Sequence, residues 1–168
     1  MNDFTSIKKI YMNCPVCGKK HEVEERERNA SIKIKGEEIF YKEKFYFCPD
    51  AGEDRHEFVT GSMANENLLN ARDTYRTRKG LLTSNEIADI SKKYGLSSAE
   101  LSDLLGWNEK AVSRYESNVI QGRAIDYALR FVKANPRNAL FLLNKNADRF
   151  TPERTAEIKS NLELMPQA

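Results

Sequence analysis

Three cysteines, Cys14, Cys17 and Cys48, lie in the first third of this 168-residue chain. The first two belong to a Cys-Pro-Val-Cys-Gly segment, where two thiolates three residues apart can bind one tetrahedral metal ion if the backbone turns tightly between them. Pro15 pre-sets φ for such a turn, and Gly18 tolerates the positive φ that follows. Cys48 is also followed by proline, so it repeats the opening of this turn. These residues predict a structural Zn²⁺ site.

The spacing leaves the fourth ligand of this site open. Ala51 stands where a fourth cysteine would complete a second Cys-x-x-Cys. The candidate replacements are His56, His21 and Asp50. We prefer His56 because it follows Cys48 on the same loop, whereas His21 sits on a strand that leaves the first turn. The metal-free alternatives are three half-buried thiols in a β-hairpin and a redox pair, although redox motifs usually open a helix and polar β-type sequence follows here.

A small antiparallel sheet is expected to position these ligands. Polar–apolar alternation and aromatic residues favour strands in four segments. These segments are residues 7–11, 21–27, 31–35 and 39–47. The segment 21–27 is strongly charged and is therefore expected at an edge, and a turn is expected at Gly36–Glu38. A sheet this small has little core of its own, so a structural metal would contribute directly to its folding.

The second half of the chain has helical patterns with clear boundaries. Ser84 precedes the first helix, Gly95 ends it, and Ser97 caps the second. Asn108 is expected to cap a third helix that continues through residue 117. Two short helices joined by a glycine-containing turn of about four residues make a helix-turn-helix. Ser102 stands where this pattern usually has alanine, and serine is small enough to keep the two helices close.

The outward positions of the third helix carry side chains that can hydrogen-bond. Lys110 and Arg114 share one helix face, and arginine is the commonest specific reader of guanine in the major groove. An ordinary helical hairpin would explain the apolar faces but not these polar positions. The DNA-binding candidates are Asn108, Glu109, Lys110, Ser113, Arg114, Ser117 and Asn118. The phosphate-contact candidates are Ser97, Ser98, Arg72, Arg76 and Lys79.

Three segments, Leu96–Leu101, Leu105–Trp107 and Val112–Glu116, resemble the XRE (Cro/repressor-like) family of DNA-binding domains. Joined to an N-terminal Cys-Pro-x-Cys-Gly module, this domain resembles the MqsA-type antitoxins. It resembles more closely the zinc-finger and helix-turn-helix portion found in some Panacea-type antitoxins, and the resemblance covers roughly residues 10–145.

The resemblance implies roles that the residue patterns alone do not supply. It implies that the zinc module contacts a toxin protein and that the helical domain forms a homodimer. It also implies that Lys110 and Arg114 read bases and that three cysteines bind zinc, although the family's fourth cysteine has no counterpart here. A dimer would bind double-stranded DNA at a pseudo-palindromic operator, since one such module buries too little surface for useful specificity.

The expected fold class is α+β, with a zinc-ribbon-like β module followed by an all-α helix-turn-helix domain. The segments are a zinc module at 1–62, a linker helix at 63–82, the XRE-type domain at 83–146 and a weakly packed tail helix at 147–168. The apolar run Ala139–Leu143 is expected to be buried in its own domain or against a second subunit. It is far short of the ~20 residues of a membrane span, and the chain's start lacks the apolar core of a signal peptide. We therefore expect a cytoplasmic protein.

Composition and motifs narrow the function to two classes. The formal net charge is +2, with 27 basic and 25 acidic side chains, so charge alone does not identify a nucleic-acid partner. An enzyme is not expected, because the chain has two histidines and no sequence motif of phosphate binding, serine hydrolysis or zinc proteolysis. A catalytic zinc is disfavoured because tight cysteine turns usually build closed sites. The main reading is an antitoxin that represses its own operon; the alternative is a stand-alone XRE-family transcription factor whose zinc module is purely structural.

Overall fold

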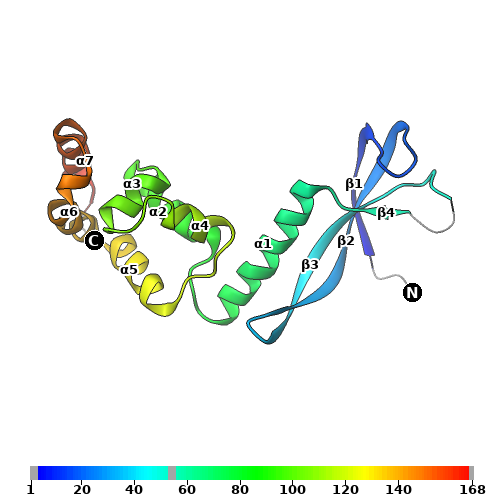
Figure 1. Cartoon of the computed structure of the whole chain (residues 1–168), viewed down its shortest axis with the longest axis horizontal. Coiled ribbons are helices and arrows are strands. Elements are labelled where there is room, and N and C mark those ends of the chain that lie inside the picture. The colour runs from blue at the N-terminus through cyan, green and yellow to red at the C-terminus, as the bar shows by residue number, and fades with distance from the viewer. Residues whose placement is uncertain (1–3, 53–55, 167–168) are drawn as a thin grey trace. The chain divides into compact units, whose positions relative to one another are not determined.

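The computed structural model describes residues 4–52 and 56–166. Over these ranges it contains one four-stranded antiparallel sheet followed by seven α-helices (Figure 1). The chain divides into two compact units, Met1–Tyr75 and Arg76–Ala168, and the division falls within α1 (Gly61–Arg78). The expected α+β class is confirmed, and the boundaries at residues 62, 82 and 146 stay predictions.

The sheet has the strand order β1-β2-β3-β4. Its members are β1 (Phe4–Asn13), β2 (Lys20–Ile34), β3 (Glu37–Phe47) and β4 (Glu57–Phe58). The turn between β2 and β3 contains Lys35 at φ 50° and Gly36 at φ 83°. Two successive positive φ values are typical of a tight type I′ hairpin, whose twist matches that of the strands. The turn therefore lies one residue earlier than expected, and Glu37 and Glu38 belong to β3.

The charged segment 21–27 lies at the centre of the sheet rather than at its edge. It is part of β2, which pairs with β1 on one side and β3 on the other, so the expectation of an edge strand is wrong. Its charges are accommodated by neighbouring strands. The Arg26 guanidinium, for example, lies 4.2 Å from the Phe4 ring centroid and 3.6 Å from that of Phe47. The segments expected at 21–27 and 31–35 are one continuous strand.

The first half of α1 packs along the edge of β3 through Asn67, which is 4 % exposed. The Lys44 backbone N–H donates to Asn67 Oδ1 at 2.9 Å, and Asn67 Nδ2 donates to the Lys44 carbonyl at 2.8 Å. In the described residues, β4 pairs with β3 at Tyr46 and Phe47 and does not reach Lys44. The Asn67 amide therefore makes the two hydrogen bonds to the Lys44 backbone that a neighbouring strand would otherwise make. Lys44 Nζ also lies 2.6 Å from Glu66 Oε1. These contacts anchor this part of α1 to the sheet.

The second unit is a helical bundle around one apolar core. Its helices are α2 (Ser84–Tyr94), α3 (Ser98–Leu104), α4 (Ala111–Ser117), α5 (Arg123–Ala134), α6 (Pro136–Lys145) and α7 (Pro152–Leu164). Thr83 and Ser97 begin α2 and α3 with capping boxes completed by Glu86 and Glu100. Gly95, at φ 62°, ends α2 in the left-handed conformation that favours glycine. In the described ranges, no helix has the length and apolar character to cross a membrane.

The last helix, α7, is an integral part of this core. Ile158 and Leu162, one turn apart, are each 1 % exposed. Arg154 Nε donates to Glu100 Oε1 at 2.7 Å and links α7 to α3. The expectation of a weakly packed tail helix is therefore wrong. Few apolar residues are needed, because two fully buried side chains and one ion pair hold α7 against the rest of the second unit.

Candidate metal centre and recognition surface

Four side chains from three strand ends gather in the first unit. Cys14, Cys17, His21 and Cys48 place their ligand atoms within 4.8 Å of one another. His21 Nε2 lies 3.2 Å from Cys17 Sγ and 3.5 Å from Cys48 Sγ. In a tetrahedral zinc site, Zn–S and Zn–N bond lengths place sulfur and nitrogen ligands about 3.6 Å apart. The cluster can therefore hold one tetrahedral metal ion, and three sulfurs with one imidazole suit zinc.

The turn after β1 has the conformation that a metal site of this type needs. The Gly18 N–H donates to the Cys14 carbonyl at 2.9 Å, and the Cys14 N–H donates to the Lys19 carbonyl at 2.9 Å. Gly18 has φ 72°, a left-handed conformation that glycine adopts without strain. β2 begins directly after this turn, so His21 lies beside Cys17 and Cys14.

The environment of Cys14 favours its thiolate form. Burial alone would raise the pKa of this thiol. The backbone N–H groups of Cys17 and Val16 and the side chain of His21 stabilise the negative charge and outweigh burial, so they hold the pKa below its ordinary value. A thiolate is the form that binds a metal ion.

The structure places His56, the preferred fourth ligand, outside the cluster. Its Nδ1 lies 2.9 Å from the Cys48 carbonyl oxygen, and its ring stacks on Phe47 with centroids 5.1 Å apart. His21 lies in the cluster because the start of β2 pairs with the end of β1, where His21 is opposite Met12. His21, one of the candidates that the sequence left open, is therefore the histidine that completes a cluster able to hold a metal ion.

Asp50 lies behind the imidazole of His21 rather than among the ligand atoms. Its Oδ2 is 3.4 Å from His21 Nδ1, while Nε2 of the same ring faces the sulfurs of Cys17 and Cys48. A carboxylate on the distal nitrogen of a metal-binding histidine selects the tautomer and orients the ring. The sequence offers Asp50 as a ligand candidate and contains no signal for this supporting role.

The second unit gathers the expected DNA-binding residues around α4. This helix begins at Ala111, later than expected, because Asn108 forms a turn before it. The Asn108 carbonyl accepts from the Ala111 N–H at 2.8 Å, and Asn108 Oδ1 accepts from the Lys110 N–H at 3.1 Å. All of the DNA-binding candidates are exposed. They are Asn108, Glu109, Lys110, Ser113, Arg114, Ser117 and Asn118.

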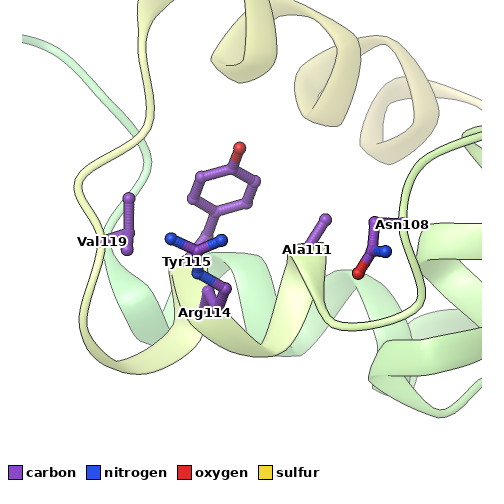
Figure 2. Close-up of a pocket in the computed structure, with 5 residues that line it drawn as sticks. All are labelled: Asn108, Ala111, Arg114, Tyr115 and Val119. Carbon is purple, nitrogen blue, oxygen red and sulfur yellow. The ribbon is translucent and has the colours of Figure 1, made fainter.

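Two cations on this surface stand out from the other candidates. In the described part of the chain, the side chains of Lys110 and Arg114 form no hydrogen bond or ion pair. Two serines on the same helix instead donate to backbone carbonyls: Ser113 Oγ to Lys110 at 3.1 Å and Ser117 Oγ to Ser113 at 2.8 Å. Figure 2 shows Arg114 beside a pocket at this surface. The lining residues are Asn108, Ala111, Arg114, Tyr115 and Val119.

Arg76 is wrong as a phosphate contact, because its side chain is 0 % exposed. Its Nη2 donates to the carbonyls of Tyr115 at 2.7 Å and Val119 at 2.8 Å, and its Nε donates to Gln121 Oε1 at 3.1 Å. These acceptors lie at the end of α4 and in the segment that follows it. Arg76 therefore stabilises the end of α4 and has no exposed surface for DNA.

The other phosphate-contact candidates keep some exposed surface. Ser97 is exposed, and its hydroxyl accepts from the Glu100 N–H as the cap of α3. Ser98 Oγ donates to Glu116 Oε2 at 2.6 Å. Arg72, in the first unit, and Lys79, in the second, are half-buried. The contact of these four residues with phosphate stays a prediction.

One protein-family model matches the part of the chain that contains both the metal cluster and α4. The model of the antitoxin component of the bacterial toxin–antitoxin system MqsA matches residues 12–159. This range includes the four metal-site side chains and the whole of α1 to α6. No curated protein and no solved structure matches the chain. Because the match extends over most of the sequence and the structure contains a three-cysteine, one-histidine cluster, the chain belongs to the MqsA antitoxin family.

Proposed function

We propose that this protein is the antitoxin of a type II toxin–antitoxin pair, which represses its own operon and neutralises a toxin through its N-terminal unit. Family membership supports an antitoxin and a DNA-binding regulator. In this proposal α3 and α4 are an XRE-type helix-turn-helix, with α4 as the recognition helix. A structural Zn²⁺ held by the four-residue cluster completes the fold of the first unit, and the protein has no enzymatic role.

The exposed pair Lys110 and Arg114 is the observation that carries the proposal of DNA reading. A guanidinium can donate two parallel hydrogen bonds to guanine O6 and N7, and a lysine ammonium can also reach these atoms. Both side chains are available because the described part of the chain supplies no partner for either. Arg72 and Lys79 are assigned to phosphates, whose contacts position the protein and carry no sequence information.

Arg114→Ala should weaken binding to the cognate operator by about 1–3 kcal/mol and relax the preference at one base position. Binding to a scrambled duplex should change much less, since the lost contact is to a base edge. Arg137→Ala is the matched control, because Arg137 is an exposed arginine on α6 whose side chain forms no hydrogen bond or ion pair within the described part of the chain. Fluorescence anisotropy on both duplexes measures the effect. Equal losses on the two duplexes would show that α4 is not the reader.

We propose that the operator is bound by a homodimer, since symmetric proteins read pseudo-palindromic half-sites. The second unit itself buries Ala139 and Leu143. Three aromatic side chains on α5 and α6 nevertheless remain exposed: Tyr127 at 62 %, Phe131 at 47 % and Phe141 at 54 %. Phe131→Glu should convert the dimer to a monomer in sedimentation at micromolar concentration and weaken operator binding. A wild-type protein that is monomeric both alone and on DNA would contradict the dimer.

The toxin is proposed to bind the first unit, on the basis of the family and of the aromatic strand β3. Phe40 in β3 is 68 % exposed, and buried aromatic anchors dominate many protein interfaces. Phe40→Glu should lower recovery of the toxin from the native host by more than about tenfold while leaving operator binding unchanged. Leu164→Glu is the control, because Leu164 is 81 % exposed on α7. If the wild-type chain recovers no toxin, the alternative of a stand-alone XRE-family transcription factor is favoured.

A further inference from the structure

Ser102 joins the two helices of the proposed helix-turn-helix through its hydroxyl. The side chain lies in α3 and is 0 % exposed. Its Oγ donates to the Ser98 carbonyl at 2.8 Å and accepts from the Val112 N–H, in α4, at 3.1 Å. A second bridge runs from Ser98 Oγ to Glu116 Oε2. Alanine at position 102 would fill the same space but could not form the bond to α4.

The Ser102 hydroxyl supplies a hydrogen-bond acceptor for a backbone N–H group at the start of α4. The first N–H groups of a helix have no acceptor within the helix, and a short polar side chain at the N-cap usually supplies one. Lys110 is at the N-cap of α4, with φ −90° and ψ 4°, and forms no side-chain cap bond. Val112 is the second residue of α4 and is fully buried. Without Ser102, its N–H would be a buried donor with no partner, which is costly.

We infer that Ser102 is a positioning residue for the recognition helix, because it caps α4 from α3. This inference rests on the proposed role of α4 in DNA reading. A seven-residue helix is marginal by itself, so its position depends on contacts from neighbouring elements. Capping from α3 also frees the N-cap position for lysine, whose long side chain can reach a base edge that serine or aspartate at that position could not reach.

Ser102→Ala tests the inference, and the smaller side chain fits the buried position. Amide hydrogen exchange followed by NMR should show faster exchange at Val112, by at least about fivefold relative to wild type, the lower end for a lost buried hydrogen bond. The amides of α2 and α5 should keep their rates, which separates a local effect from general destabilisation. Operator affinity should fall by a similar factor, while affinity for a scrambled duplex should change by less than about twofold.

Ser91→Ala is the matched control. Ser91 lies in α2, is 5 % exposed, and its hydroxyl has no hydrogen-bond partner in the described structure. Its replacement should change neither Val112 exchange nor operator affinity. Unchanged Val112 exchange in Ser102→Ala overturns the cap, and faster exchange with unchanged operator affinity overturns the positioning role. Equal affinity of the wild-type chain for both duplexes would overturn the proposed DNA reading, whereas Val112 exchange tests the cap independently of DNA.

Discussion

His21→Ala is expected to weaken Zn²⁺ binding by more than about 100-fold and to unfold the first unit, since supporting residues around a metal site already account for 10–100-fold when replaced. The buried cluster near the metal site contains little besides Cys14, Val23 and Cys48. With so small a core, the free energy of metal binding contributes directly to folding. Competition with a chromophoric chelator measures the affinity, and limited proteolysis of residues 4–52 reports the unfolding.

His56→Ala is the control for this experiment. It removes a ring that stacks on Phe47 and bonds to the Cys48 carbonyl, but it leaves the ligand cluster intact. This variant should retain close to one equivalent of zinc with a modest loss of stability. If His56→Ala loses zinc while His21→Ala retains it, His56 rather than His21 is the fourth ligand.

Arg76→Ala is expected to lower the free energy of unfolding of the second unit by about 3 kcal/mol or more. The substitution leaves the carbonyls of Tyr115 and Val119 and the side-chain oxygen of Gln121 without their donor. Each buried acceptor without a partner costs about 1–3 kcal/mol. Chemical denaturation followed by the fluorescence of Trp107, the single tryptophan, measures the loss. This probe is well placed, because its ring lies 6.1 Å from that of Tyr115.

Arg137→Ala is the matched control for Arg76→Ala as well, since exposed substitutions usually change stability by less than about 0.5 kcal/mol. A different result would reinstate Arg76 as a phosphate contact. In that case the Arg76→Ala variant would have the same free energy of unfolding as the wild type but would bind both cognate and scrambled DNA more weakly. The expected outcome is the opposite, with the stability loss dominating any change in affinity.

Helix boundaries in the second unit could be predicted because they depend on local chemistry. Gly95 must adopt a positive φ, and Ser97 with Glu100 forms a capping box, so both signals lie within a few residues of the boundary that they specify. The start of α4 was predicted too early, because Asn108 is a capping residue by type but bonds within a turn instead. A capping residue alone does not distinguish these two uses.

The remaining errors concern residues whose partners are distant in the sequence. Arg76 is basic and lies on a helix, so local patterns favour exposure, whereas its acceptors lie 39 to 45 residues later. Composition alone places the charged segment 21–27 at an edge, because it does not reveal the cross-strand partners of these charges. The sequence favours His56 over His21 for the same reason, since it is the pairing of β1 with β2 that brings His21 to the cysteines.

The amide of Asn67 has a consequence for how this protein can be divided into fragments. An uncovered strand edge is a template for pairing with another chain and hence for aggregation. A fragment that ends at Thr60 would retain β3 but lose the side chain that covers Lys44. Such a fragment is expected to self-associate through its edge strands even with zinc bound, whereas one that extends to Tyr75 keeps its protective helix. Cleavage between Thr60 and Asn67 would therefore leave an aggregation-prone fragment rather than an independent soluble module.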